Sequence, residues 1–353
     1  MDFNQLKVFY FSGTGNARHV VYWIEALAKA ENLESKIIDI SKLKSRRDIQ
    51  TEANNLIGFC SPTHGFNFPP IMFHFILRFP RSKGNRVFII NTRAGMKMGK
   101  YFLPGLSGIA QYFSAFVLWL KGYKIIGMHP IDLPSNWISF HPGLKPKVVE
   151  SIYGKRKQET ELFAQKILSG KTDRKALRDL IQDIAITPVA ALYYTIGRFI
   201  LAKSFYASRD CTNCMLCVNK CPVQAIKVID KRPFWTYKCE SCMQCINICP
   251  ERAIETAHGF VIGSYYLISF VLLVLIYKWL EISSIVNRFI SEWLSGFVQF
   301  FIDVVLILLL FFSFYRIFHY LLRFKPFERL IYFTSLTRFK FWRRYKTPNM
   351  FNV

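Results

Sequence analysis

Short apolar runs alternate with amphipathic stretches over the first half of the chain. Residues 6–11 (LKVFYF) are almost continuously apolar, as is typical of a strand buried on both faces of a parallel sheet. Apolar residues then recur at helical spacing over about 17–31. The pattern predicts further strands at 35–40, 56–60, 86–92 and 123–128, helices between them, and another helix near 146–168. Five strands joined through helices predict an α/β domain with a doubly wound parallel sheet and right-handed crossovers.

Two long apolar stretches near the C-terminus predict helices that cross a membrane. They lie at about 261–280 and 297–320, and the centre of each is uncharged. Each approaches the ~20 residues needed to cross the hydrocarbon core, and aromatic residues lie near its ends. We therefore expect a transmembrane α-helical hairpin within 259–322.

One acidic residue, Asp303, falls inside the second apolar stretch. A carboxylate within a bilayer is costly, so it usually has a partner or belongs to a proton pathway. The alternative is a place at the membrane interface, one turn inside the helix, and this is the place that we expect.

Residues 171–207 follow the predicted sheet. They begin with a charged helical pattern and continue into an apolar stretch interrupted by Pro188, Gly197, Arg198 and Lys203. These four residues disfavour a membrane span. We expect connecting helices here. Whether they touch the membrane surface is not decided by the sequence.

The net charge of +24, from 47 basic and 23 acidic side chains, first suggests a nucleic-acid partner. Its densest part, however, is the tail 323–353, which carries eight basic residues and one acidic residue directly after the hairpin. There Arg338, Lys340, Arg343 and Arg344 alternate with aromatic residues. This mixture also occurs in nucleic-acid binders, but next to a membrane it favours anionic lipid headgroups. We expect a lipid bilayer with anionic lipids, and no nucleic acid, as a partner.

The distribution of charge also predicts a topology. The linker 281–296 contains Glu281, Arg288 and Glu292, whereas the tail is strongly basic. Positive-inside counting places the tail in the cytoplasm and the linker outside. The expected location is the cell (inner, cytoplasmic) membrane, with two passes and with both termini in the cytoplasm.

Eight of the nine cysteines fall within 39 residues and form an internal repeat with an offset of 28 residues. The two runs are Cys211-x-x-Cys214-x-x-Cys217-x-x-x-Cys221-Pro222 and Cys239-x-x-Cys242-x-x-Cys245-x-x-x-Cys249-Pro250. A disulfide scaffold suits small secreted domains, and no signal peptide is recognisable here. Zinc sites usually pair two C-x-x-C units. Two runs of four cysteines, each closed by Cys-Pro, instead favour iron–sulfur clusters, which soft thiolate ligands suit.

The spacing resembles that of bacterial-type two-cluster ferredoxins over roughly 208–258. The resemblance implies an α+β module with two [4Fe–4S] clusters, in which the fourth cysteine of each run ligates the other cluster. The implied metal ligands are Cys211, Cys214, Cys217 and Cys249 for cluster 1, and Cys239, Cys242, Cys245 and Cys221 for cluster 2. The ninth cysteine, Cys60, ends an apolar run, and we interpret it as a buried apolar residue with no redox role.

A loop of small residues, Ser12-Gly13-Thr14-Gly15-Asn16-Ala17, joins the first strand to the first helix. Such a loop offers an anion site, because its N–H groups and the helix N-terminus point to one place. It is not the dinucleotide fingerprint, since Arg18 replaces the third glycine, and it lacks the Gly-Lys-Ser/Thr of a P-loop. Taken alone it could equally be a tight turn.

With a strand before it and a helix after it, the loop resembles the FMN-phosphate loop of the flavodoxins. The resemblance covers about residues 1–170 and implies a flavodoxin-like order of strands, with FMN at the switch point. Two later loops, Ser61–Phe66 and Asn91–Met96, take the places of the flavin-flanking loops. The implied FMN-binding residues are Ser12, Gly13, Thr14, Gly15, Asn16, Ala17, Pro62, Thr63, His64, Gly65, Phe66, Asn91, Thr92, Arg93, Ala94 and Gly95.

Two features depart from simple flavodoxins. Ala17 stands where a Thr or Ser is common, and MHPIDLPSNW follows the fifth strand. The latter is similar to fused flavodoxin–ferredoxin proteins. We interpret His64 as a surface or hydrogen-bonding residue rather than a catalyst. Phe66 is the candidate to cover a flavin face. No catalytic residue is assigned.

The expected organisation has five parts. These are a flavodoxin-like FMN-binding domain (1–170), connecting helices (171–207), a 2[4Fe–4S] ferredoxin domain (208–258), the transmembrane hairpin (259–322) and a basic cytoplasmic tail (323–353).

The expected function is that of a membrane-anchored electron-transfer protein that links FMN, two clusters and a redox protein, with a quinone or membrane complex as a further partner. A flavin-dependent oxidoreductase acting on a quinone or small substrate is one alternative, and a redox sensor or accessory subunit is another.

Overall fold

The computed structural model describes residues 3–43, 49, 52–82, 84–282 and 291–348. They divide into two compact units. The sheet unit holds Met1–Tyr194, Glu240–Asn247 and Arg343–Val353, and the hairpin unit holds Thr195–Cys239 and Ile248–Trp342.

The sheet unit contains one six-stranded sheet. Its strands are β1 (Gln5–Tyr10), β2 (Glu34–Asp39), β3 (Asn55–Pro62), β4 (Arg86–Met98), β5 (Tyr101–Leu103) and β6 (Lys124–Pro134). Five strands are parallel in the order β2-β1-β3-β4-β6, while β5 pairs antiparallel with the end of β4. This is the flavodoxin-like doubly wound order, and the predicted fold class is confirmed.

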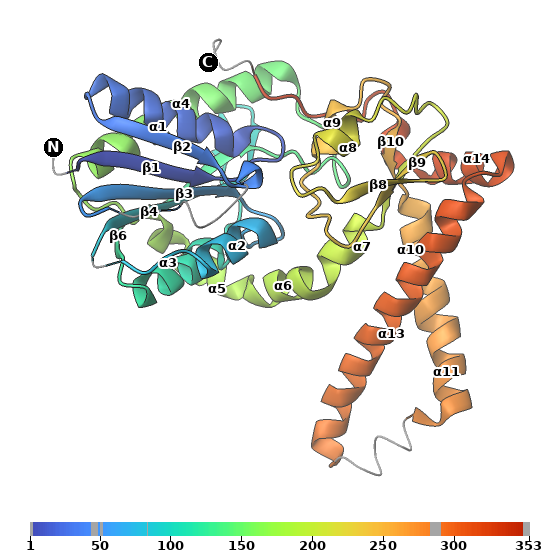
Figure 1. Cartoon of the computed structure of the whole chain (residues 1–353). Coiled ribbons are helices and arrows are strands. Elements are labelled where there is room, and N and C mark those ends of the chain that lie inside the picture. The colour runs from blue at the N-terminus through green and yellow to red at the C-terminus, as the bar shows by residue number, and fades with distance from the viewer. Residues whose placement is uncertain (1–2, 44–48, 50–51, 83, 283–290, 349–353) are drawn as a thin grey trace. The chain divides into compact units, whose positions relative to one another are not determined.

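Helices cover both faces of this sheet (Figure 1). They are α1 (Asn16–Ala30), α2 (Pro70–Leu77), α3 (Ala110–Leu120) and α4 (Pro146–Leu168). The unit also contains the short helices η1 (Ile40–Lys42), η2 (Lys175–Asp179), α5 (Leu180–Ala185) and α6 (Thr187–Leu192). In α1 the residues Val20, Val21, Ile24 and Ala28 are buried at helical spacing, which fixes the face that packs on the sheet. α1 and α4 lie on one face, and α2 and α3 on the other.

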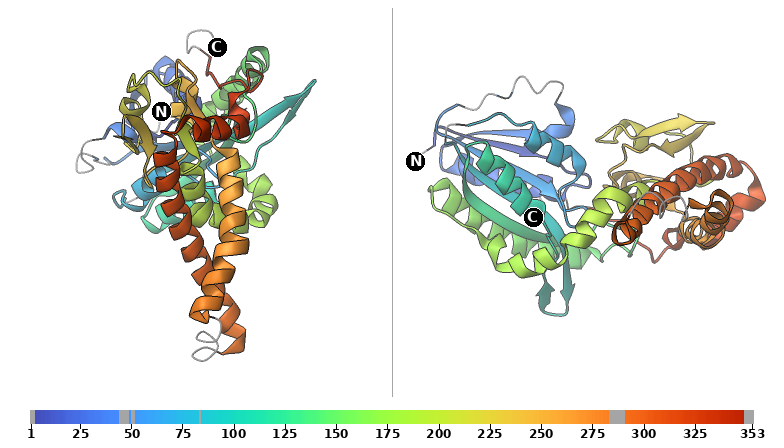
Figure 2. Two further views of the ribbon diagram at one scale, coloured as in Figure 1. Left: turned by 90° about the vertical axis from the view of Figure 1, so that its right-hand side faces the viewer. Right: turned by 90° about the horizontal axis from the view of Figure 1, so that it is seen from below.

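β4 and β6 run beyond the other strands at the carboxyl edge of the sheet. Their pairing extends to Gly95 opposite Pro134, and Gly99, with a φ of +57°, turns the chain back into β5 (Figure 2). The prediction of a loop over Asn91–Met96 is therefore wrong, because these residues belong to β4. The physical reason is an ion pair across the two strands, in which Arg93 Nε lies 2.6 Å from Asp132 Oδ1.

The hairpin unit contains two small antiparallel pairs of strands, β7 with β10 and β8 with β9. Its elements begin within η3 (Tyr193–Gly197) and continue with α7 (Arg198–Ala202), β7 (Phe205–Ala207), α8 (Leu216–Asn219), β8 (Ile226–Ile229), β9 (Arg232–Trp235) and β10 (Ile254–Thr256). α9 (Gln244–Ile248) belongs mostly to the sheet unit. The chain then forms α10 (His258–Tyr266), η4 (Leu267–Leu272), α11 (Leu273–Leu280), α13 (Glu292–Leu321), α14 (Lys325–Thr334) and η5 (Leu336–Arg338).

Within the described part of the chain, two helices are long and apolar enough to cross a membrane, His258–Leu280 and Leu294–Leu321. They lie side by side (Figure 2), and the rings of Phe260 and Phe318 stack with centroids 4.2 Å apart. Ile268, Leu273 and Phe311 form a second cluster between them. Lys175–Ala185 and Thr187–Ala202 together would reach the same apolar length, but they are bent by 75°.

Asp303 lies deeper in its helix than we expected. Because α13 begins at Glu292, Asp303 is about three turns inside it rather than one. Its Oδ1 accepts a hydrogen bond of 2.7 Å from the hydroxyl of Tyr277 on α11. The acid thus has a partner within the hairpin. Arg288 of the predicted linker lies outside the described residues.

Candidate cofactor sites

Four cysteines of the hairpin unit line one small pocket. Cys211, Cys214 and Cys217 come from the first run, and Cys249 comes from the end of the second. These are the four residues that the ferredoxin resemblance implies for cluster 1. Soft sulfur donors on several sides of one space are the donor set that an iron–sulfur cluster needs.

The backbone repeats itself together with the sequence. Within the first run Asn213 and Met215 adopt positive φ angles of 54° and 61°, and within the second Ser241 and Met243 adopt 52° and 62°. Left-handed conformations are uncommon for residues other than glycine and mark places where the chain is held in a required turn. Both runs therefore curl in the same way around the space between their cysteines.

The surroundings of the two runs differ. Met243 is 1% exposed, whereas Met215 at the equivalent position is 37% exposed. Cys214 is exposed as well. Cys242 and Cys245 belong to the sheet unit, and Cys221 and Cys239 to the hairpin unit, so the ligand set of cluster 2 stays a prediction.

The predicted phosphate loop lies at the carboxyl end of β1 and opens α1. Gly15 has a φ of +107°, which a glycine adopts without strain, and its N–H donates to Ser12 Oγ at 3.1 Å. Thr14 Oγ1 accepts a hydrogen bond from Asn136 Nδ2. The first turn of α1 contains no acidic residue, which suits an anion at the helix N-terminus.

The side chain of Asn16, one of the implied FMN-binding residues, bonds to groups of the protein rather than pointing to the anion site. Its Nδ2 donates to the Pro134 carbonyl at 2.9 Å, and its Oδ1 accepts from the Tyr153 hydroxyl at 2.7 Å and from Tyr345. Asn16 thereby fixes the loop, and its backbone N–H is what it can offer a phosphate. Ala17 is fully buried.

The last described residues of the chain cover the same loop. A Cβ atom added to Gly15 would lie 2.9 Å from Thr347 Cγ2, and the imidazole of His19 contacts the Pro348 carbonyl at 3.1 Å. Sequence reasoning placed this tail at lipid headgroups. In the structure Trp342 and Tyr345 are buried, while Phe341 is exposed.

The loop that follows β3 is tied to its neighbour β4. Thr63 N–H donates to the Thr92 carbonyl at 2.8 Å, and Asn91 Nδ2 donates to Thr63 Oγ1 at 2.7 Å. Gly65 and Phe66 both have a positive φ. Asn91 and Thr92 thus position the predicted flavin-flanking loop from within a strand. Arg93 is taken up by Asp132 and Asp179, and Ala94 and Gly95 continue the strand.

His64 is buried in this loop. Burial lowers the pKa of its imidazole to about 4, while the Glu240 carbonyl acts in the opposite direction. The ring is therefore neutral near pH 7. A neutral, buried imidazole fits the hydrogen-bonding role that we expected for His64. The expected place at the surface is wrong, because the side chain is buried.

The turn Glu240–Met243, from the second cysteine run, lies against these loops within the sheet unit. A Cβ atom on Gly13 would lie 2.6 Å from Cys242 Cβ and 2.8 Å from its carbonyl oxygen, so only glycine permits this approach. The Trp137 indole donates to the Ser241 carbonyl at 3.3 Å. The phosphate loop, the His64 loop and the loop after β6 thus all meet this turn.

Several residues of this site were missed in the sequence. Trp137 stands in the stretch that departs from simple flavodoxins, and its ring lies 5.5 Å from that of Tyr193, which covers Gly65. Tyr193 and Tyr345 carry no local motif. Their positions depend on contacts between distant parts of the chain, which periodicity does not reveal.

The residues present fit FMN. Hydroxyl groups of Ser12 and Thr14 lie at the N-terminus of a 15-residue helix. Ser61 Oγ and His64 Nδ1 are buried, and neither has a hydrogen-bond partner among the residues that the structure describes. Unpaired buried polar atoms are costly, and a polar cofactor beside this loop would satisfy them.

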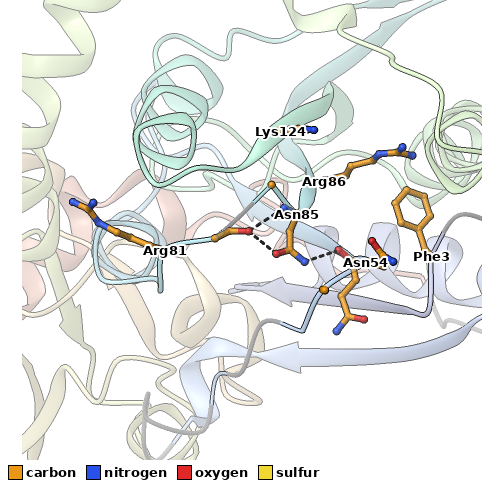
Figure 3. A pocket seen from close by; sticks show the side chains of 10 residues that line it. Phe3, Asn54, Arg81, Asn85, Arg86 and Lys124 are labelled. Carbon is orange, nitrogen blue, oxygen red and sulfur yellow. Dashed lines mark hydrogen bonds between the residues drawn. The ribbon is translucent and has the colours of Figure 1, made fainter.

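A separate hollow lies at the opposite, amino edge of the sheet, where β3, β4 and β6 begin (Figure 3). Its lining includes Arg81, Arg86 and Lys124, and the ring of Phe3 lies under the Arg86 guanidinium at 5.3 Å. None of the predicted site residues line it.

Residues 210–254 match the family model described as the 4Fe-4S dicluster domain. A comparison with curated proteins gave no match.

Solved structures resemble the sheet part of the chain. The rubredoxin oxygen:oxidoreductase from Desulfovibrio gigas is 12% identical, and the match covers 47% of this chain and 36% of that one, with a TM-score of 0.32. Flavodoxin 1 from Bacillus cereus is 16% identical over 44% of this chain and 97% of that one, with a TM-score of 0.28. A flavodoxin from the domain Archaea is 15% identical over 46% of this chain and 98% of that one, again with a TM-score of 0.28.

The order of the strands identifies the sheet as flavodoxin-like. The chain joins a flavodoxin-like sheet, a 4Fe-4S dicluster domain and two helices that could span a membrane.

Proposed function

We propose that this chain is a membrane-anchored electron-transfer protein that passes electrons between FMN and two [4Fe–4S] clusters. The observation that carries the proposal is the contact between the second cysteine run and the FMN loops, in which Gly13 meets Cys242 directly. FMN exchanges electrons singly or in pairs, whereas a cluster takes one at a time. A cysteine turn that touches the flavin loops is the arrangement such an exchange needs.

The chain's own residues divide the work of holding these groups. Cys211, Cys214, Cys217 and Cys249 would hold cluster 1, and Cys239, Cys242, Cys245 and Cys221 would hold cluster 2. The hydroxyls of Ser12 and Thr14 would bind the FMN phosphate. Trp137 and Tyr193 would exclude water from the space beside Gly65, where their rings lie.

Of the two clusters, the one held by Cys242 and Cys245 would be the neighbour of the flavin. The exposed Cys214 belongs to the other cluster, so cluster 1 would face a redox protein. The sequence shows no nicotinamide fingerprint, which favours a protein over NAD(P)H as the partner. A quinone or a membrane complex is the expected partner on the membrane side.

The two apolar helices would anchor these groups at the cytoplasmic face of the cell membrane. The tail after residue 322 carries eight basic residues, and the positive-inside rule places it in the cytoplasm. Reduced cysteines and iron–sulfur clusters suit the same compartment.

The test is the cofactor content of the full chain, purified anaerobically in detergent. We expect about eight irons, about eight acid-labile sulfides and about one FMN for each chain. Cys217→Ser should lower the iron content and alter one cluster's magnetic signal while FMN stays bound. Cys60→Ser is the matched control, because Cys60 is fully buried within β3 and does not line the described pocket of cluster-1 cysteines. Zinc in place of iron, or equal iron loss in both variants, would contradict the proposal.

A further inference from the structure

Helix α3 turns large apolar side chains to the outside of the sheet unit. Phe116, Trp119 and Leu120 are spaced as neighbours on one side of the helix, and Trp119 is 62% exposed. The sequence from Ala110 to Leu120 contains no charged residue. Soluble proteins seldom leave such a stripe uncovered.

The helical run Lys175–Ala185 also exposes large apolar side chains. Leu177, Ile181 and Ile184 follow one side of it, and Ile181 is 87% exposed. Its two acidic residues point the other way. Asp179 pairs with the buried Arg93, and Asp183 accepts a hydrogen bond of 2.8 Å from Gly108 N–H.

The two stripes belong to one surface. Tyr112 on α3 donates its hydroxyl to the Ala176 carbonyl at 2.6 Å and also contacts Asp183 Oδ2 at 3.1 Å. These bonds hold α3 beside the helical run Lys175–Ala185. We call the surface formed by Phe116, Trp119, Leu120, Leu177, Ile181 and Ile184 the apolar face.

Basic residues flank the apolar face. Arg178 is exposed on the run that carries Ile181, Arg174 is exposed directly before that run, and Lys121 follows α3 directly. Apolar helix sides with a tryptophan, bordered by Lys and Arg, are typical of helices that lie in the plane of a membrane interface. An acidic protein would meet the cations but leave the apolar side chains unpaired.

We propose that the apolar face lies on the surface of the lipid bilayer, with its side chains at the headgroup boundary. The proposal rests on the membrane anchoring under Proposed function, and it adds a second, monotopic contact made by the flavodoxin-like part itself. Its occupant is lipid rather than a second copy, because two helices of the same chain are long and apolar enough to span a bilayer and the flanking charge is positive. The 75° bend before Thr187 suits a helix pair that follows an interface rather than crosses it.

The test uses the full chain, loaded with iron and flavin, in vesicles of phosphatidylcholine and phosphatidylglycerol. The photoreactive residue p-benzoylphenylalanine replaces Ile181, Leu162 or Leu309 in three separate proteins. Leu162 is the matched control, because it is 63% exposed but lies on α4, which covers the other face of the sheet. Leu309 is 58% exposed on α13 and reports on the anchor.

We expect lipid adducts at position 181 to exceed those at position 162 on the order of tenfold, with adducts at 309 as well. Adducts at 309 but equal amounts at 181 and 162 would overturn the proposal while leaving the anchor intact. Crosslinks from 181 to another copy or to another protein would also overturn it. Failure at 309 would mean that the anchoring itself is wrong, and the proposal would fall with it.

A second variant tests the same face by its chemistry. Ile184→Asp places a charge beside Ile181 without touching any cofactor loop. We expect it to lower the lipid adducts at position 181 several-fold, with iron and FMN content unchanged. Unchanged adducts would contradict the proposal.

Discussion

Arg93 and Asp132 face each other on the neighbouring strands β4 and β6 and are both buried. Asp132 Oδ1 also accepts the Gly105 N–H at 2.8 Å, and its Oδ2 lies 3.2 Å from Arg156 Nη2. Burial opposes the charge on Arg93, but Asp132 and Asp179 outweigh it and raise the pKa of the guanidinium. This network extends β4 past the point where its sequence turns polar.

Removing one partner of this network should be costly. Asp132→Asn leaves the buried Arg93 with Asp179 and the buried Arg156 with Glu159 as the remaining charge partners, and we expect the free energy of unfolding of the sheet unit to fall by ~1–3 kcal/mol. Urea denaturation followed by tryptophan fluorescence measures it. Glu25→Gln breaks only a surface pair with Lys29, 2.7 Å long, and should cost ~0.3–0.5 kcal/mol. Equal costs in the two variants would show that the network adds no stability.

The same residues show a limit of sequence reasoning. NTRAG reads as a polar loop, because its ion-pair partners at positions 132 and 179 are far away in the chain. The first strand, its small-residue loop and α1 were predicted well, because the signals for all three are local. The side-chain bonds of Asn16 were not, since they depend on Tyr153 and Tyr345.

At the scale of elements, regular periodicity was a good guide and strand ends were not. The helix expected near 146–168 is α4, Pro146–Leu168. The fifth parallel strand, however, continues from 128 to Pro134, and its extension leads directly to Trp137. The two cysteine runs repeat in sequence and their backbones are alike, but only tertiary contacts decide which run meets the predicted FMN loops.

The contact between the phosphate loop and the Glu240–Met243 turn can be tested with one methyl group. Gly13→Ala places a Cβ atom 2.6 Å from Cys242 Cβ and 2.8 Å from a backbone oxygen, so the turn must move. We expect a loss of ~1–3 kcal/mol in stability and a reduced content of both FMN and iron. Thermal unfolding and cofactor analysis measure the two effects.

Gly154→Ala is the control for this substitution. Gly154 lies within α4, and an added Cβ atom would meet nothing within 4 Å. Alanine there should stabilise the protein by ~0.5–1 kcal/mol and leave the cofactors in place. If Gly13→Ala kept its full content of FMN and iron, the contact between the phosphate loop and the Glu240–Met243 turn would not be needed to hold the cofactors.

At the scale of the whole molecule, the proposed anchoring predicts which segments lie on each side of the membrane. We expect an epitope tag inserted within 283–290 to be reached by antibody from outside intact cells. A tag after Val353 should be reached only after the cells are opened, because the basic tail is held inside. Protection of the first tag, or exposure of the second, would reject the topology. Immunofluorescence with and without detergent separates these outcomes.

The covering of the phosphate loop by Tyr345, Thr347 and Pro348 has a consequence for how the protein is made. The loop is synthesised among the first residues, but the segment that closes it emerges after both apolar helices. Under the function proposed above, a ribosome would deliver both helices to the membrane before the segment that closes the predicted phosphate loop is made. We therefore expect stable loading with FMN to follow insertion, so that an early arrest of translation would leave the sheet domain without flavin.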